Sequence, residues 1–427
     1  MINKVKKLVA NNKNKKLISN FSYLSFIAIV NKLLPLAVLP YIVRTIGVEK
    51  FGTITFAWAL ISFFILITKY SFVLTAVKHI SLNRDNKNEL SSYVWTVFTL
   101  RIFFAIIVLF IFLISLFVFD KLHNEIIVML FTFIMVFADV LMPMCFFRGI
   151  EEMKYIAIFN LIAKILYTVG IFIFIHHESD YIWIPLLNGL TTFIISLYAM
   201  YYIHKKYKIV ITKPKLADMI MLVREGKDIF ISNLSVSFYT TINPILLGIL
   251  GGYTAVGIYS LAESIYSASS TIIKSFTMVI HPHLARYTSE IEKLYRQARK
   301  FFYMYLFVLI NAAFILYILS GFVITLLYGE GHSESVEIMQ ILALALLLEP
   351  LGNFFTFYLS LKTKYSIIRN ITFKTMILNL ILVVPMIHYY QAKGLAYLFL
   401  LLSVVQVYLN SVNNKELFTF NKKKEAS

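Results

Sequence analysis

The sequence predicts an all-α protein that crosses a lipid bilayer many times, and three observations lead to this fold class. Of the 427 residues, 59% are hydrophobic and only 15% are charged. A soluble globular domain is about 45–50% apolar with about 25% charged residues, so this chain carries more apolar surface than one soluble core can bury. Apolar stretches also recur along the chain with the length of about 20 residues that a transmembrane helix needs.

Twelve such stretches are expected to be transmembrane helices. Turn-forming residues separate several of them, as at 82–86, 176–180 and 251–252. The expected helices lie near residues 17–43, 53–77, 91–119, 126–147, 154–175, 181–203, 226–250, 254–280, 301–327, 336–361, 366–388 and 394–414.

The loops between these stretches indicate the direction of each crossing. Thirty Lys and Arg residues lie on the side of the N-terminus, and only Arg44, Lys50, Lys121 and Lys393 lie on the opposite side. Cytoplasmic loops carry such an excess of Lys and Arg, so both termini are expected in the cytoplasm. The formal net charge of +18 then reflects topology, and nucleic acid is not an expected partner.

The longest polar connection divides the chain into two lobes of six helices. We expect an N-terminal lobe with a basic N-terminal arm, a cytoplasmic linker, and a C-terminal lobe with a basic tail. Their boundaries are 1–207, 208–225 and 226–427. Repeats of this kind are common in transporters.

A short pattern supports a repeat, because two glycines and one lysine recur 205 residues further along the chain. The pairs are Gly47 and Gly252, Gly52 and Gly257, and Lys69 and Lys274. Coincidental glycine spacing is the alternative explanation. Since six crossings separate the members of each pair, the two lobes would share one orientation in the membrane.

Nine ionisable residues fall inside the expected helices, where each costs about 2.5–3.5 kcal/mol on insertion scales. The cations are Lys32, Lys69, Arg101, Lys164, Lys274 and Lys374, and the acids are Asp139, Glu263 and Glu349. Groups this costly are expected to face a water-filled cavity or one another. A cavity with more cations than acids attracts anions, and Lys and Arg are suitable donors to phosphate.

Structural roles remain open for several of these residues. Lys69, Lys274 and Lys374 lie within reach of the membrane surface through their long side chains. Asp139 either neutralises Lys164 or Arg101 or takes part in ion coupling, and both roles stay open for the two glutamates. No metal site or cofactor is expected: Cys145 is the only cysteine, and the loop with His176, His177, Glu178 and Asp180 is too short and exposed to favour metal binding.

Three motifs resemble those of a known family. They are Pro40-Tyr41-x-x-Arg44-x-x-Gly47-x-x-x-Phe51-Gly52, Phe146-Phe147-Arg148-Gly149-Ile150-Glu151-Glu152-Met153, and Val256-Gly257-Ile258-Tyr259-Ser260. Together they are similar to the signatures of the Wzx-type polysaccharide flippases, in the polysaccharide transporter family of the multidrug/oligosaccharidyl-lipid/polysaccharide exporter superfamily. Two positions depart from the family pattern, with Arg148 in place of the usual Gln and Cys145 in place of the common Trp.

The resemblance implies a two-lobed fold like that of the multidrug exporters (MATE proteins) of this superfamily. It also implies a flippase in the bacterial cytoplasmic (inner) membrane that moves an undecaprenyl-pyrophosphate-linked oligosaccharide by alternating access. The product would be O-antigen of lipopolysaccharide or a capsule. Coupling to H⁺ or Na⁺ and a polysaccharide polymerase as partner are further expectations.

Three other functions are compatible with this architecture. An ion-coupled multidrug antiporter shares the expected fold, although an organic cation favours an acidic cavity. A flippase for a peptidoglycan precursor would use similar chemistry, although such proteins typically have fourteen crossings. A membrane enzyme of polysaccharide assembly would need an outer domain for its substrate, and the outer loops here have at most about ten residues.

Overall fold

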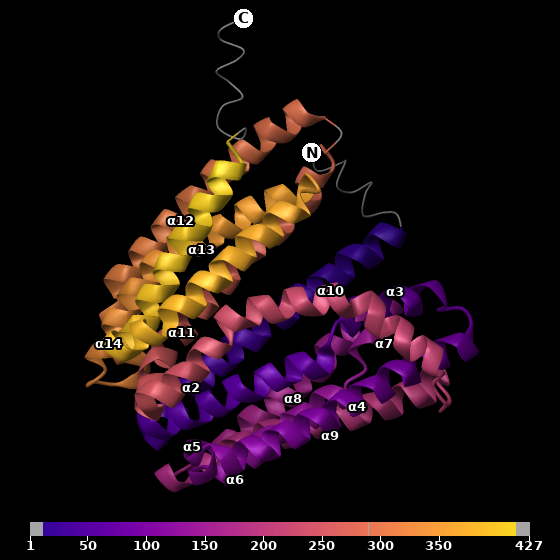
Figure 1. The fold of residues 1–427 in the computed structure, drawn as a ribbon, viewed down its shortest axis with the longest axis horizontal. Coiled ribbons are helices and arrows are strands. Elements are labelled where there is room, and N and C mark those ends of the chain that lie inside the picture. Colours follow the sequence, from indigo (N-terminus) through magenta and orange to yellow (C-terminus); the bar gives the residue numbers. More distant parts are fainter. Residues whose placement is uncertain (1–11, 289, 416–427) are drawn as a thin grey trace, which may run out of the picture. The chain divides into compact units, whose positions relative to one another are not determined.

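Helices make up 90% of the residues that the structure describes, as the sequence predicts. The structure, a computed structural model, describes residues 12–288 and 290–415, and contains no β-strand in that part of the chain (Figure 1). The helices are α2 (Asn12–Lys69), α3 (Phe72–Leu82), α4 (Lys87–Val118), α5 (Asp120–Asn124), α6 (Ile126–Leu141), α7 (Met144–Gly149), α8 (Met153–Phe174), the 3₁₀ helix η1 (Glu178–Ile182), α9 (Trp183–Tyr207), α10 (Leu216–Thr240), α11 (Ile242–Ala285), α12 (Ile291–Tyr328), α13 (Ser333–Leu361) and α14 (Tyr365–Asn413).

Nine helical stretches in the described residues are long and apolar enough to cross a membrane. Three of these stretches have 49, 59 and 49 residues, at least twice the length of about 20 residues that one crossing requires. Each of the three contains a residue with non-helical backbone angles, at Gly47, Gly252 and Gln391. When each long stretch is counted as two crossings, the total is twelve, in agreement with the number expected from hydropathy.

The two glycine turns have nearly the same backbone conformation. Gly47 has φ 77° and ψ 167°, and Gly252 has φ 86° and ψ 171°. A positive φ of this size is readily adopted only by glycine. The 205-residue offset seen in the sequence therefore joins positions with the same local structure, which supports an internal repeat.

The glycines that follow these turns make reciprocal close contacts. A Cβ atom added to Gly52 would lie 1.8 Å from the carbonyl oxygen of Tyr253, and one added to Gly257 would lie 2.2 Å from that of Val48. Val48 and Tyr253 are themselves 205 residues apart, so each hairpin presents its glycine to the equivalent residue of the other. Only glycine allows the two backbones to approach so closely.

The chain divides into two compact units. Unit 1 comprises Met1–Val38 and Ala57–Leu234, and unit 2 comprises Leu39–Phe56 and Ser235–Ser427. The units differ from the expected lobes in two segments: the hairpin at 39–56 lies in unit 2, and the expected linker and most of α10 lie in unit 1. The reciprocal glycine contacts explain the first difference, and the hydrogen bond from the Tyr70 hydroxyl to the Val223 carbonyl (3.1 Å) is consistent with the second.

Many large apolar side chains point away from the interior of their own unit. On α4, the side chains of Phe103, Ile107, Phe110, Ile114 and Phe117 are all exposed, at the three- and four-residue spacing of one helix face. A soluble protein rarely exposes so long an apolar stripe. This face of α4 therefore fits contact with lipid.

Candidate functional site

Three of the intramembrane charges meet in unit 1. One carboxylate oxygen of Asp139, Oδ1, lies 2.9 Å from Lys69 Nζ. The other, Oδ2, accepts a hydrogen bond from Arg101 Nη2. Asp139 thus bridges two cations that come from different helices, and we call these three residues the unit 1 charge cluster.

A break in the helix of the second expected span places Lys69. Helix α2 ends at Lys69, Tyr70 has a positive φ of 46°, and α3 begins at Phe72. The Tyr70 ring stacks on Phe104 and Phe230 at centroid distances of 5.5 and 4.5 Å, which holds this break in place. Lys69 lies in the last turn of α2, where a cation is favoured by the helix dipole.

A second break, caused by proline, positions Asp139 and Arg101. Pro143 has no N–H group, so it cannot donate to the carbonyl of Asp139 four residues earlier. The Met142 N–H (3.2 Å) and Arg101 Nη2 (2.8 Å) donate to that carbonyl instead. Arg101 Nη1 also donates to the Met142 carbonyl, at 3.3 Å. The end of α6 therefore provides Arg101 with both backbone acceptors and a carboxylate.

The unit 1 charge cluster has two cations and one carboxylate, so its formal charge is +1. The Arg101 side chain is only 7% exposed and the Asp139 side chain 19%, so both act in surroundings where charge interactions are strong. Arg101 Nε is buried without a hydrogen-bond partner. Unsatisfied buried donors are rare in folded proteins, so the site does not use the full hydrogen-bonding capacity of this guanidinium.

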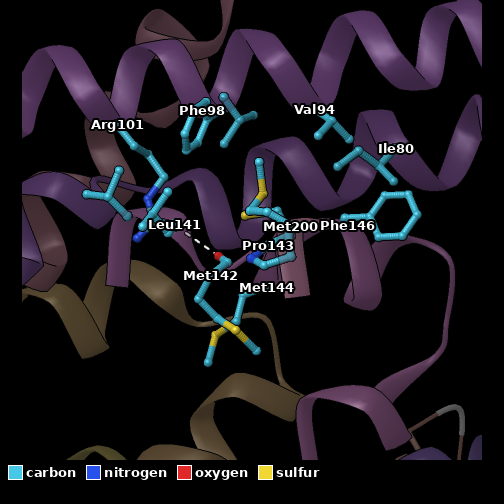
Figure 2. A pocket seen from close by; sticks show the side chains of 13 residues that line it. Ile80, Val94, Phe98, Arg101, Leu141, Met142, Pro143, Met144, Phe146 and Met200 are labelled. Atoms are coloured by element: carbon cyan, nitrogen blue, oxygen red, sulfur yellow. Dashed lines mark hydrogen bonds between the residues drawn. The ribbon is translucent and has the colours of Figure 1, made fainter. Parts of the chain in front are cut away.

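Two hollows adjoin the cluster. The first spans about 350 Å³ and the second about 260 Å³, including the part of each that opens to its surroundings. The second contains Lys69 and Asp139, whereas Arg101 is the one charged residue among the thirteen that line the first (Figure 2). Figure 2 shows Arg101 at one end of the first hollow, bonded to Met142, and Ile80 and Phe146 at the other end.

Unit 2 holds a comparable but neutral pair. Lys274 Nζ on α11 lies 2.9 Å from Glu349 Oε1 on α13. Asn353 Nδ2 donates to the same oxygen at 2.7 Å, and the hydroxyl groups of Tyr266 and Ser270 donate to Oε2 at 3.4 Å. Since Lys69 and Lys274 are 205 residues apart, each half of the chain pairs its equivalent lysine with a carboxylate. In both halves the acid lies close to a proline, Pro143 in α6–α7 and Pro350 in α13.

The remaining predicted charges lie on α2, α8, α11 and α14. Lys164 is half-buried on α8, with Nζ 5.7 Å from the centre of the Tyr167 ring. Glu263 is half-buried on α11, and Lys374 is exposed on α14. Lys32 lies on α2, but its side chain is outside the described residues. Of the two partners considered for Asp139, the structure pairs it with Arg101.

The residues of the family-like motifs have structural roles where the structure records their contacts. Arg44, which follows Pro40 by one turn, donates from Nη2 to the Leu326 carbonyl in the last turn of α12, at 2.7 Å. A Cβ on Gly149 would lie 2.3 Å from Ile80 Cγ2, so this glycine lets α7 approach α3 closely. Arg148 Nε is buried without a hydrogen-bond partner. Gly47, Gly52 and Gly257 form the turns and contacts described above.

Neither the apolar hollow nor the aromatic contacts of Tyr70 were predicted from the sequence. Pro143 within an expected span was the available signal, since a proline there interrupts the helix.

In the described residues, no three His, Cys, Asp or Glu side chains are grouped to hold a metal ion. In the loop with two histidines, Asp180 Oδ2 accepts the backbone N–H groups of His176 and His177 at 2.9 and 2.8 Å, so this carboxylate is used in a turn.

Comparison with known families identifies the class of protein. A family model described as "Polysaccharide biosynthesis protein" matches residues 17–288. This is more than half of the chain, which therefore belongs to that family. Together with its long apolar helices, this membership makes the chain a multi-pass membrane protein.

Individual relatives and structures agree with this assignment. The chain is 26% identical over 381 residues to a protein of Escherichia coli (strain K12), covering 88% of this chain and 91% of the relative, and 24% identical over 372 residues to one of Shigella dysenteriae, covering 86% and 91%. Both bear the name "Putative O-antigen transporter". In fold, the chain resembles the lipid II flippase MurJ in an inward closed conformation, with a TM-score of 0.73, 14% identity, and coverage of 93% of this chain and 87% of MurJ. It also resembles an outward-facing multidrug resistance MATE transporter of the MOP superfamily, with a TM-score of 0.64, 13% identity and 98% coverage of both chains.

Proposed function

We propose that this protein is a flippase that moves a lipid-linked oligosaccharide, carried on undecaprenyl pyrophosphate, from the inner to the outer leaflet of the bacterial cytoplasmic membrane. The moved unit would serve the assembly of a surface polysaccharide, either O-antigen or capsule. Three facts support this proposal: membership of the polysaccharide biosynthesis family, relatives named as O-antigen transporters, and a fold shared with a lipid II flippase. The protein acts in this proposal as a transporter and not as an enzyme.

The unit 1 charge cluster is the observation that carries the proposal at the level of residues. A polar head group with a pyrophosphate must leave water to cross the bilayer, and cations in a low-dielectric site reduce that cost. Lys69 and Arg101 supply two cations against the one carboxylate of Asp139. Arg is well suited to a phosphate group, since its guanidinium donates two parallel hydrogen bonds.

Asp139 and Glu349 give this flippase a route for ion coupling. Each carboxylate holds a lysine at 2.9 Å. An anionic substrate must compete with the carboxylate for that lysine, and a proton or Na⁺ on the carboxylate would release the lysine to the substrate. Such differential binding biases a two-state equilibrium, here between inward-open and outward-open arrangements of the two lobes. Lys32, Lys164 and Lys374 remain proposed contacts to the phosphates or to acidic sugars.

The distribution of loop charges supports the orientation in this proposal, with both termini in the cytoplasm. The short outer loops leave little room for a catalytic domain there. A polysaccharide polymerase acting on the flipped unit is the partner that this scheme requires on the outer side.

Complementation of a deletion strain tests the proposal. Deleting the gene should abolish the surface polysaccharide, and Arg101→Met or Lys69→Met should fail to restore it although the protein is present at the normal level. Lys87→Met is the matched control, because Lys87 is an exposed lysine at the start of α4 with no recorded ion pair, and it should restore the polymer fully. Normal polymer in the Arg101→Met strain would contradict the assignment of the site.

The fold shared with a multidrug MATE transporter favours one alternative, export of organic cations. The same strains distinguish the two functions. If drug resistance rises on overexpression and the polysaccharide is normal after deletion, the protein is a drug exporter and the flippase proposal is wrong.

A further inference from the structure

The first hollow beside the unit 1 charge cluster has the features of a site for an apolar chain. Its walls come from α3, α4, α6, α7 and α9, with the connection between α6 and α7. Val97 and Phe146 in its lining are buried, whereas Phe98, Met144 and Met200 are half-buried. The half-buried side chains in the lining are consistent with a hollow that opens to its surroundings.

Arg101 lies between this apolar hollow and the second hollow, which Lys69 and Asp139 also line. Arg101, Met142, Met144 and Cys145 line both hollows. Arg101 meets the Asp139 carboxylate at the second hollow. A ligand in contact with Arg101 would therefore have one charged end and one apolar end.

The size and lining of the apolar hollow restrict what this end can be. The hollow is small: it spans about 350 Å³ when the part that opens to its surroundings is included. A sugar would leave many hydroxyl groups without partners on these walls, at a large cost for each. Methionine side chains adapt to irregular apolar groups, and three of them, Met142, Met144 and Met200, line the hollow.

We propose that the apolar hollow binds the first isoprene units of the polyprenyl chain, while the pyrophosphate contacts Arg101 and Lys69. The inference rests on the proposed function and adds to it a subsite for the lipid within unit 1. The remainder of the chain stays in the bilayer, because the hollow has room for only its first units. Recognition then depends on the carrier lipid, and one transporter can accept different sugars.

Binding of two probes to the full-length protein in lipid nanodiscs tests the proposal. The probes are inorganic pyrophosphate and geranyl pyrophosphate, and empty nanodiscs correct for partition into lipid. Geranyl pyrophosphate should bind at least about tenfold more tightly than pyrophosphate, since burial of two methylene-sized groups is enough for that difference.

Two substitutions on α9 separate the hollow from the general lipid surface. Met200→Phe places a bulky ring in the hollow and should remove the preference for the geranyl probe without changing the affinity for pyrophosphate. Leu197→Phe adds the same ring one turn away, on a side chain that is 45% exposed and does not line either hollow, and should keep the full preference.

Photo-crosslinking of the unchanged protein gives a second test that does not depend on a folded variant. A geranyl pyrophosphate with a photoreactive group on its chain should label peptides that contain residues 94–101 and 140–146. Labelling confined to other helices would overturn the subsite.

The outcomes separate this inference from the proposed function. If pyrophosphate binds and Arg101→Met weakens it, but the geranyl group adds nothing or Met200→Phe leaves its contribution intact, the subsite is wrong and the flippase proposal stands. If neither probe binds to the unchanged protein, the polyprenyl-pyrophosphate substrate class is wrong, and the subsite is wrong with it.

Discussion

Replacing Asp139 with Asn removes one negative charge from the unit 1 charge cluster with almost no change in shape. Lys69 Nζ and Arg101 Nη2 would then face an amide in place of a carboxylate. Removing one partner of a buried ion pair costs about 3–5 kcal/mol, because an uncompensated charge is left behind. Lys69 is 38% exposed, so the loss of its ion pair should lower the unfolding free energy by at most about 1 kcal/mol. Arg101 keeps its two backbone acceptors, which places the expected loss at the lower end, about 3 kcal/mol.

Denaturation of the purified protein in mixed micelles, followed by tryptophan fluorescence, measures this loss of unfolding free energy. The double variant Asp139→Asn, Arg101→Met removes the stranded cation and should recover about 2 kcal/mol of the loss, as expected for residues in direct contact. If Asp139→Asn costs less than about 1 kcal/mol, or if the double variant loses the sum of the two single losses, Asp139 does not neutralise Arg101.

Three further substitutions test other contacts by the same denaturation measurement. Gly52→Ala places a Cβ atom 1.8 Å from the Tyr253 carbonyl oxygen and should lower the unfolding free energy by more than about 2 kcal/mol. Gly321→Ala is its control, since the nearest atom to the added Cβ there is 3.9 Å away. A helical alanine at that position should stabilise the protein by up to about 1 kcal/mol. An equal effect at both glycines would contradict the close approach of the hairpins. Glu349→Gln should cost about 1–2 kcal/mol, less than the change at Asp139, because the lysine that it strands is 39% exposed; a larger loss at Glu349 than at Asp139 would reverse this ranking. Arg44→Ala removes a charged hydrogen bond at an exposed site and should cost about 1 kcal/mol, with faster hydrogen exchange confined to the last turn of α12; unchanged exchange there would show that the bond does not form in solution.

The sequence was sufficient to predict the fold class and the count of crossings. Both depend on local properties, the length of an apolar stretch and the positions of turn residues, which need no knowledge of distant contacts. The 205-residue offset also came from the sequence, and the matching angles at Gly47 and Gly252 give it a structural basis. A φ near 80° is readily adopted only by glycine, so this part of the repeat can be read from the positions of the glycines in the sequence.

The pairing of charges could be predicted only in part. Asp139 had two candidate partners, Lys164 and Arg101, and hydropathy cannot choose between them because both lie near mid-span. The orientation of α4 and the end of α6 before Pro143 bring Arg101 to the Asp139 carboxylate. Both depend on how the helices pack, which hydropathy does not specify. Contact with the membrane surface and a role in the cavity were both open for Lys69, and in the structure it lies beside Asp139, just before the break at Tyr70.

By itself, the sequence predicted an all-α membrane protein of about twelve crossings, with a repeated glycine and lysine pattern and an excess of cations over acids within the expected helices. Hydrophobic length, loop charge and glycine position carry that information locally. Only the tertiary structure shows which charges compensate one another. It also shows that the hairpin at 39–56 packs with the second half of the chain and that an apolar hollow adjoins Arg101. These features depend on where side chains from separate helices meet, and no local pattern in the chain specifies that meeting.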